Sequence, residues 1–182
     1  RALCDVSRNL DDQQLLALKK TGGVIQVVAY SAFIKAAKPD SAERAAALAA
    51  ARGAFGLPDP TNPGQQARFQ AALKRLPADR RAEYEKTLAE IDRQYPGDPP
   101  ARLQDFIDHI DYAVKLIGID HVGIASDFDG GGGVVGWNDA AETFNVTLEL
   151  VRRGYTEDEI EKLWGGNLLR VMDEVQRVAS GL

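Results

Sequence analysis

Val122-Gly123-Ile124-Ala125-Ser126-Asp127-Phe128-Asp129-Gly130 is the stretch that decides the fold, because a short apolar run ends there abruptly in two carboxylates. An apolar run of this length is typical of a strand that is buried on both faces of a parallel sheet. Glycines occupy positions 130 to 133, and they allow a sharp turn and a close approach of a ligand to the backbone. A carboxylate at the carboxyl end of such a strand lies where α/β barrels carry their catalytic groups.

The size and composition of the chain limit what it can be. Its 182 residues suffice for one ordinary domain. The formal net charge of −5 argues against a nucleic-acid partner, which binds a clustered basic surface. The sequence has no run of apolar residues long enough for a transmembrane segment. The single cysteine, Cys4, excludes an internal disulfide, and we interpret it as a small buried apolar residue.

Helix and strand signals alternate along the rest of the chain. Residues 11–14 (Asp-Asp-Gln-Gln) form a capping box that begins a helix, and the β-branched residues between positions 24 and 30 favour a strand. Apolar residues recur at helical spacing between positions 103 and 117. The stretch Gly165-Gly166-Asn167 is expected to break or bend the helical pattern near the C-terminus. The further predicted helices span residues 140–153, 156–164 and 168–179.

The segment from about residue 35 to 100 differs from its surroundings. Residues 42–52 are rich in alanine, and residues 57–64 form a loop with three prolines. Two more helices are predicted over residues 65–76 and 79–94. This segment has low strand content, and we interpret it as a helical insertion.

The order of elements is helix, strand, helical insertion, helix, strand and helices. This order predicts an α/β fold, the C-terminal part of a (β/α)₈ TIM-type barrel. Two strands do not close a barrel, which needs about 250 residues in total. The chain also begins at Arg1 without an initiator methionine. We therefore expect residues 1–182 to be the C-terminal portion of a single barrel domain that needs the remainder of the barrel, which lies upstream.

Asp127 is the first candidate for chemistry. Alternation along the strand places it on the face that carries Gly123 and Ala125, and small residues suit a crowded barrel interior. At that position it can act as a general base or move a proton between a metal-bound water and a leaving group. The alternative is a turn-forming aspartate before a glycine loop. Asp129, two residues further on, is interpreted as a loop-stabilising carboxylate and is the second candidate.

Four other side chains are candidates for binding. Arg8 carries a planar fork that suits a substrate carboxylate, although most arginines are solvated surface residues. Tyr30 and Phe33 follow the end of the first strand, where they either line a pocket or pack in the core. Trp137, just beyond the glycines, has the same two interpretations.

The two histidines do not form a metal-binding motif. His109 lies in the middle of a predicted helix, and His121 lies at the start of the last strand, opposite the active end of a barrel. Neither belongs to a His-x-His or His-Glu-x-x-His pair. No metal ligand is therefore predicted within this chain.

The stretch from Gly118 to Gly130 resembles the last barrel strand of the membrane (renal) dipeptidases, and the four glycines resemble those of longer bacterial members. Three other stretches are similar to that family in the same order. They are Arg8-Asn9-Leu10 with Asp12, Thr21-Gly22-Gly23-Val24-Ile25, and Arg153-Gly154-Tyr155-Thr156 leading to Gly165-Gly166-Asn167-Leu168-Leu169-Arg170-Val171.

The resemblance implies a (β/α)₈ barrel of the metal-dependent amidohydrolase kind, with two zinc ions, that hydrolyses dipeptides. Several members of the family accept a D-residue at the C-terminal position, and some open β-lactam rings. The family's zinc ligands are a His-x-Asp pair, a glutamate and two later histidines, and the resemblance places all of them upstream of Arg1. It assigns the acid/base role to Asp127 and recognition of the substrate's C-terminal carboxylate to Arg8. A homodimer and a dipeptide substrate are the expected partners.

Two alternatives stay open. The first keeps the fold and hydrolyses another amide or a lactone with zinc. The second is a non-catalytic barrel that has lost its metal ligands and serves as a binding protein. Side-chain preference and compartment are not decided by the sequence.

Overall fold

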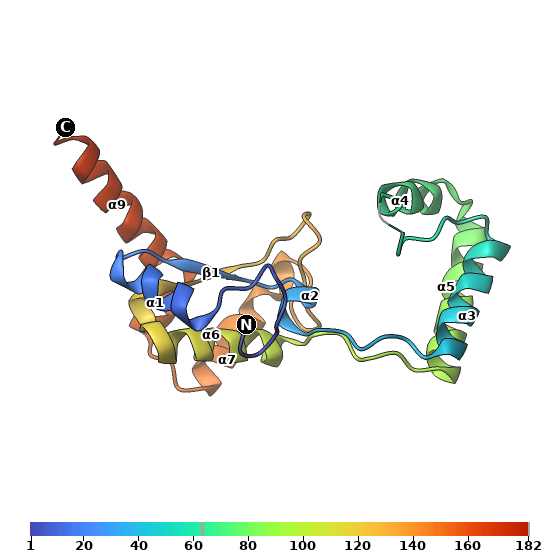
Figure 1. The fold of residues 1–182 in the computed structure, drawn as a ribbon, viewed down its shortest axis with the longest axis horizontal. Helices are drawn as coiled ribbons and strands as arrows, with labels where there is room; N and C mark the ends of the chain where they lie inside the picture. The colour runs from blue at the N-terminus through green and yellow to red at the C-terminus, as the bar shows by residue number, and fades with distance from the viewer. Residues whose placement is uncertain (63, 182) are drawn as a thin grey trace. The chain divides into compact units, whose positions relative to one another are not determined.

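The computed structural model describes residues 1–62 and 64–181. It divides the chain into two compact units: unit 1 comprises Arg1–Ala37 and Pro100–Leu182, and unit 2 comprises Lys38–Pro99 (Figure 1). Unit 2 falls within the segment of about residues 35–100, for which the sequence predicts a helical insertion.

Unit 1 contains both strands of the described chain. Both strands are shorter than predicted, and the helix predicted over residues 140–153 begins as a 3₁₀ turn. The elements of unit 1 are α1 (Asp12–Lys20), β1 (Ile25–Val28), α2 (Ser31–Ile34), α6 (Leu103–Ile117), η1 (Ile119–His121), β2 (Val122–Ala125), η2 (Ala140–Glu142), α7 (Thr143–Arg152), α8 (Glu157–Glu161), η3 (Lys162–Gly166) and α9 (Asn167–Ala179).

The strands pair in parallel, with Ile25 opposite Val122 and Val28 opposite Ala125. β2 is almost completely buried, whereas β1 is half-buried along its whole length. Among the described residues each strand pairs with the other alone, so each has one edge without a strand neighbour. The fold is therefore α/β and mostly helical. Two parallel strands are consistent with a barrel, but they do not by themselves show one.

The core of unit 1 is built on one face of α6. Phe106, Ile107, Ile110 and Ile117 of this helix are fully buried, at the helical spacing that the sequence predicted. They belong to one cluster with Val122 of β2. Burying each such side chain contributes roughly 1.5–3 kcal/mol, so α6 fixes β2 in place.

Asn167 holds the beginning of β2. This buried side chain donates from Nδ2 to the carbonyls of Ile119 (2.7 Å) and Val122 (2.8 Å). The bend predicted at residues 165–167 is a π-helical turn, η3, through which the helix continues into α9. The Asn167 side chain of the Gly-Gly-Asn stretch therefore has a structural role, which is to hold the start of β2.

Arg153 connects α7 to α6. Its guanidinium contacts Asp108 (2.5 Å), Asp111 (2.6 Å) and Glu149 (3.2 Å). The hydroxyl of Tyr155 donates to Asp111 at 2.7 Å. Burial, together with that hydrogen bond, raises the pKa of Tyr155. The Arg-Gly-Tyr-Thr stretch is thus explained by contacts between helices.

Unit 2 consists of α3 (Ala42–Ala54), α4 (Gln66–Arg75) and α5 (Ala78–Gln94) around a separate apolar cluster. Tyr84 is buried there, with its ring 5.1 Å from that of Phe55 in an edge-on contact. The two ends of the unit are joined, because the Lys38 amide donates to Asp98 at 3.2 Å. Arg44 strengthens this closure by donating to the Tyr95 carbonyl at 2.8 Å.

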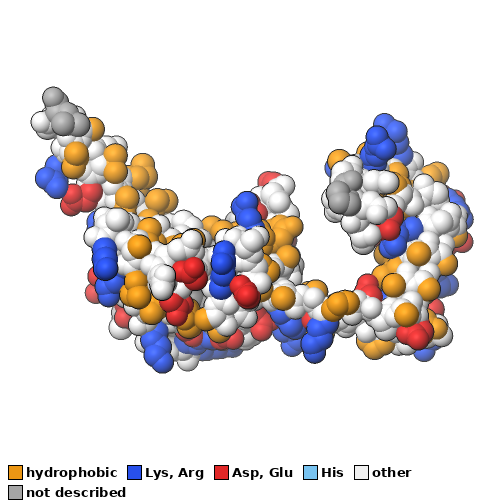
Figure 2. Space-filling model, in the orientation of Figure 1, with side chains coloured by type: hydrophobic (Ala, Val, Ile, Leu, Met, Phe, Trp, Pro, Cys, Tyr) orange, Lys and Arg blue, Asp and Glu red, His pale blue; other side chains and the backbone are white. Residues whose placement is uncertain are grey.

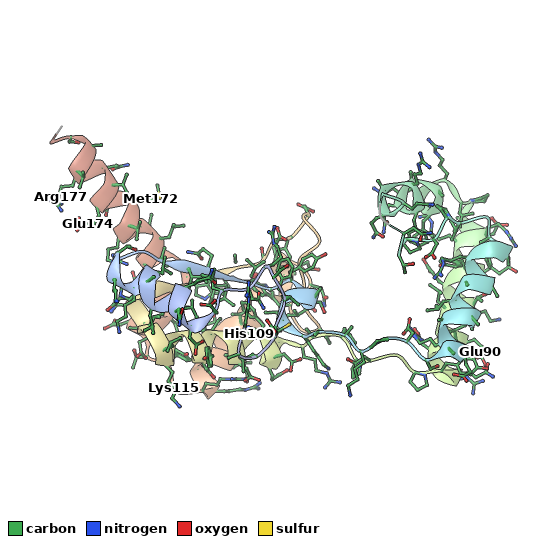
Figure 3. All side chains as sticks on the ribbon, viewed as in Figure 1. Glu90, His109, Lys115, Met172, Glu174 and Arg177 are labelled. Carbon is green, nitrogen blue, oxygen red and sulfur yellow. The ribbon has the colours of Figure 1, made fainter. Side chains whose placement is uncertain are left out.

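The helix α9 carries an apolar face that is exposed to solvent. Its exposed apolar side chains are Leu168, Leu169, Met172, Val175 and Val178, and hydrophobic side chains are visible along this helix in Figure 2. Figure 3 shows Met172 on the opposite side of the helix from Glu174 and Arg177. None of the described helices is long and apolar enough to span a membrane.

Candidate functional site

Asp127 lies in a turn beyond the end of β2. The strand ends at Ala125, so the predicted alternation does not extend to Asp127, and its direction is set by the turn instead. Its φ is +57° and that of Asp129 is +65°, both in the left-handed region. Such a conformation costs an ordinary residue roughly 1–2 kcal/mol. It persists only where the surrounding contacts impose it, as often happens at functional sites.

Backbone hydrogen bonds impose this turn. The Asp127 carbonyl accepts from the amides of Gly130 (3.1 Å) and Gly132 (2.8 Å). The Gly133 amide donates to the carbonyl of Ala29, at the carboxyl end of β1, at 2.6 Å. The loop that carries Asp127 is therefore attached to the ends of both parallel strands, while the Asp127 side chain is exposed.

Trp137 anchors the far end of the same loop. Only 2% of its surface is exposed, and the Phe128 ring contacts it edge-on at 5.4 Å. Its indole Nε1 donates to the hydroxyl of Thr143 at 3.2 Å. Of the two interpretations that the sequence left open for Trp137, the structure supports packing.

Arg8, Phe33 and Tyr30 form a continuous series of contacts. The Arg8 guanidinium carbon lies 5.6 Å from the centre of the Phe33 ring, a cation–π distance. The rings of Phe33 and Tyr30 are 4.6 Å apart. A Cβ atom on Gly131 would lie 3.2 Å from the Tyr30 ring. The series therefore extends from Arg8 to the glycine loop that presents Asp127.

A small cavity of about 200 Å³ lies beside β1. Arg8, Phe33, His109 and Tyr112 are among its lining residues, whereas Tyr30 and Asp127 are not. Ligand pockets commonly have volumes of about 300–1,000 Å³, so this cavity is too small to be a complete substrate site. It lies next to the arginine end of the contact series.

Sequence reasoning missed the role of Asn9. Its Nδ2 donates to the carbonyls of Cys4 (2.9 Å) and Phe33 (2.8 Å). This pair of bonds ties the segment that carries Arg8 to the aromatic residue beneath it. The available signal was an amide side chain directly after the arginine.

The two histidines each contact a backbone carbonyl. His109 Nε2 lies 2.9 Å from the Ile34 oxygen, and His121 Nδ1 lies 2.8 Å from the Gly23 oxygen. Burial lowers the pKa of His109. Across residues 1–62 and 64–181, no group of three or more His, Cys, Asp or Glu side chains could hold a metal ion. The side chains described here do not fit a metal centre by themselves.

Two parallel strands, whose carboxyl ends are joined by the loop that carries Asp127, define the chain as an α/β protein. The whole chain, residues 1–182, matches the family model described as membrane dipeptidase, peptidase family M19. The chain belongs to this family, as the resemblance predicted.

Two solved structures are similar to this chain. The crystal structure of the probable dipeptidase PvdM from Pseudomonas aeruginosa is 44% identical, with a TM-score of 0.64 over 97% of this chain and 43% of that one. A metallo peptidase from Rhodobacter sphaeroides, liganded with a phosphinate mimic of L-Ala-D-Ala, has the same fold at 18% identity and a TM-score of 0.54. That match covers 94% of this chain and 33% of the other.

Among curated proteins, dipeptidase ataJ of Aspergillus terreus is 49% identical over 74 residues, which are 40% of this chain and 18% of the relative. Dipeptidase aclJ of Aspergillus oryzae is 43% identical over 83 residues, 45% of this chain and 20% of the relative. The matches therefore span about a fifth of each of these curated relatives.

Proposed function

We propose that residues 1–182 supply the proton-transfer and carboxylate-binding part of a zinc-dependent dipeptidase. The observation that carries the proposal is the loop at the carboxyl ends of β1 and β2. It holds Asp127 in a left-handed turn and contacts Tyr30, from which aromatic packing leads to Arg8. Family membership and the relatives named as dipeptidases favour the same reaction.

The barrel belongs to the same proposal. We infer that β1 and β2 are the last two strands of a (β/α)₈ barrel, whose other strands lie outside this chain. The open edge on each strand supports this inference, as does the match to less than half of the PvdM chain. In a barrel the active site lies at the carboxyl ends of the strands, where the Asp127 loop is found.

Arg8 would bind the free carboxylate of the dipeptide. Its guanidinium lies over Phe33, whose carbonyl is tied to Asn9, so the planar fork has an aromatic surface to lie on. Two parallel N–H···O bonds from such a fork recognise a carboxylate with defined geometry. This contact would explain a preference for dipeptides, in which a carboxylate follows directly after the scissile bond.

Asp127 would move the proton in hydrolysis. As a carboxylate it accepts a proton from the attacking water while the C–O bond forms. It then gives that proton to the amide nitrogen, so that the C–N bond breaks and a neutral amine leaves. The exposed side chain on a fixed backbone suits this double role, because it must reach the water and the leaving group in turn.

The zinc ions of the proposal would need ligands from outside residues 1–182. The side chains described here do not assemble a metal site, so no step of the reaction is assigned to zinc from this structure. The roles of Arg8 and Asp127 stand on their own geometry.

The experiment that tests the proposal compares Asp127→Asn with Asp129→Asn in the complete, metal-loaded protein, with an L,L-dipeptide as substrate. We expect Asp127→Asn to lower kcat by at least about 100-fold, in the usual range for an acid/base group. Asp129→Asn should lower it much less. Near-normal turnover of the Asp127 variant with unchanged metal content would refute the acid/base role.

A second comparison tests Arg8. Arg8→Ala should raise KM for a dipeptide and leave KM for the corresponding dipeptide amide almost unchanged, because only the former offers a carboxylate. Equal losses with both substrates would contradict the assignment. If amides or lactones without a carboxylate prove the better substrates of the unaltered protein, the enzyme is a hydrolase of another class.

The proposal includes acceptance of a D-residue at the C-terminal position. The Rhodobacter sphaeroides structure contains a mimic of L-Ala-D-Ala, which makes this dipeptide the natural probe. Comparison of kcat/KM for L-Ala-D-Ala and L-Ala-L-Ala tests it. Turnover of the L,L-dipeptide alone would remove this part of the proposal.

A further inference from the structure

The four consecutive glycines after Asp129 fall into two kinds. Gly131 and Gly133 have φ values of +103° and +132°, so the backbone itself requires glycine there. Gly130 and Gly132 have no such φ, and an alanine could adopt their backbone conformation. A different reason must therefore exclude side chains at positions 130 and 132.

At position 132 the reason is the backbone of the turn. A Cβ atom on Gly132 would lie 2.1 Å from the Ser126 carbonyl oxygen and 2.7 Å from Asp127 Cβ. These distances are far below van der Waals contact, and the first partner is main chain. The loop thus passes directly over the peptide that joins Ser126 to Asp127, which is possible only without a side chain.

At position 130 the reason is the carboxylate itself. A Cβ atom on Gly130 would lie 2.5 Å from Asp127 Oδ1 and 3.3 Å from Oδ2. The Cα of Gly130 therefore packs against one side of the carboxylate and limits the directions that this group can take. Because the carboxylate is the end of a rotatable side chain, an added methyl group would displace it without moving the main chain.

The loop is stiff enough for these contacts to matter. Its beginning is held by the hydrogen bonds to the Asp127 carbonyl, and Gly133 is bonded to the end of β1. Phe128 is fixed against the buried Trp137. A displacement at position 130 therefore cannot be absorbed by the loop as a whole and falls on the carboxylate.

We propose that Gly130 and Gly132 are positioning residues for the Asp127 carboxylate: Gly132 sets the backbone from which it extends, and Gly130 sets its direction. The inference rests on the proposed function of Asp127 and adds to it. Neither glycine is assigned a contact with the substrate, since both act through Asp127.

The test uses Gly130→Ala and Gly132→Ala in the complete, metal-loaded protein, with Gly165→Ala as the matched control. A Cβ atom on Gly165 would have no other atom within 4 Å, and the backbone φ of Gly165 is not in the left-handed region. We expect Gly130→Ala to lower kcat roughly 10- to 100-fold, because a misplacement of about 1 Å has effects of that size. Its KM for dipeptides and its thermal midpoint should change little. Gly165→Ala should behave like the unaltered protein.

A second readout does not depend on turnover. The ¹³C signal of the Asp127 carboxylate should shift in Gly130→Ala, while the amide signals of α6 remain in place. Gly132→Ala should show the same loss of kcat with a lower thermal midpoint, because main chain must move.

The outcomes separate this inference from the proposed function. If Asp127→Asn is fully active, the acid/base role fails whatever the glycine variants do. If Asp127→Asn is inactive but Gly130→Ala retains full kcat and an unchanged carboxylate signal, the positioning role alone is overturned.

Discussion

Unit 1 and unit 2 use their long-range bonds in different places. In unit 1, Arg153 bonds Asp108 across 45 positions of sequence, and Asn167 bonds Val122 across another 45, so these bonds hold the helices and the strand next to the candidate site. In unit 2, Lys38 bonds Asp98 across 60 positions and Arg44 bonds Tyr95 across 51, so these bonds join the two ends of the unit. The candidate site lies wholly within unit 1. The difference indicates that long-range bonds fix the elements beside the site in unit 1, whereas in unit 2 they close the unit at its ends.

The largest expected effect is on the core of unit 1. Phe106→Ala removes a fully buried ring that packs 5.5 Å from Trp137, and it should lower the free energy of unfolding by roughly 3–5 kcal/mol. Hydrogen exchange should then accelerate throughout unit 1. Tyr84→Ala, the counterpart in unit 2, should accelerate exchange in unit 2 alone; general acceleration by both variants would contradict the division into two units.

The next effect in size concerns the buried amide. Asn167→Ala leaves the carbonyls of Ile119 and Val122 without their side-chain donor, which should cost roughly 1–3 kcal/mol in unfolding free energy. Chemical denaturation of the complete protein measures it. Arg44→Ala is the comparison in unit 2, where hydrogen exchange should accelerate near Tyr95 and Asp98. Equal acceleration of hydrogen exchange in β2 by this variant would contradict the prediction.

A smaller effect is pH-dependent and specific to unit 1. Burial lowers the pKa of His109 from its ordinary value of 6.5, so the folded state favours the neutral ring. Its contribution to stability is complete above that value and is lost as the pH falls through the lowered pKa. We expect hydrogen exchange of the α6 amides, corrected for intrinsic rates, to accelerate as the pH is lowered from 7 to about 5. His109→Gln should reduce this acceleration.

Unit 2 is the control for that experiment, because both histidines of the chain belong to unit 1. Exchange in α3 and α5, corrected for intrinsic rates, should stay level over the same range. A parallel change in both units would show that His109 is not the cause.

The smallest effect is expected from removal of unit 2. Its ends are joined by the bond from Lys38 to Asp98, so a short Gly-Ser link can replace residues 38–99. Every candidate site residue lies in unit 1, and kcat/KM for dipeptides should therefore stay within about tenfold, or roughly 1.4 kcal/mol. A larger loss of kcat/KM, with unit 1 still folded, would show that the insertion takes part in catalysis.

The sequence predicted the elements well wherever the signal was local. The capping boxes at Asp11 and Thr156 begin helices as expected, and the apolar spacing of residues 103–117 gave α6 with its correct buried face. The limits of the strands were less accurate, because a strand ends where its pairing ends. Pairing depends on a partner that is far away in sequence.

The sequence could nominate candidate residues for the site, but it could not give their geometry. Asp127 stood out because a carboxylate ended an apolar run, but strand alternation could not give its direction. That direction depends on the left-handed turn and on the bond from Gly133 to Ala29, which joins residues about a hundred positions apart. Asn9 was overlooked for the same reason, since its partner Phe33 is adjacent only in space.

Cys4 is a natural probe of local opening at the N-terminal end of the chain. It is the only thiol in the sequence, just 3% of its surface is exposed, and its carbonyl is held by Asn9 beside Arg8. A thiol reagent can reach it only when the N-terminal segment opens. The rate of labelling would therefore report how often the N-terminal segment that carries Arg8 opens. A bound dipeptide that contacts Arg8 should slow the labelling, and this test needs no substitution in the protein.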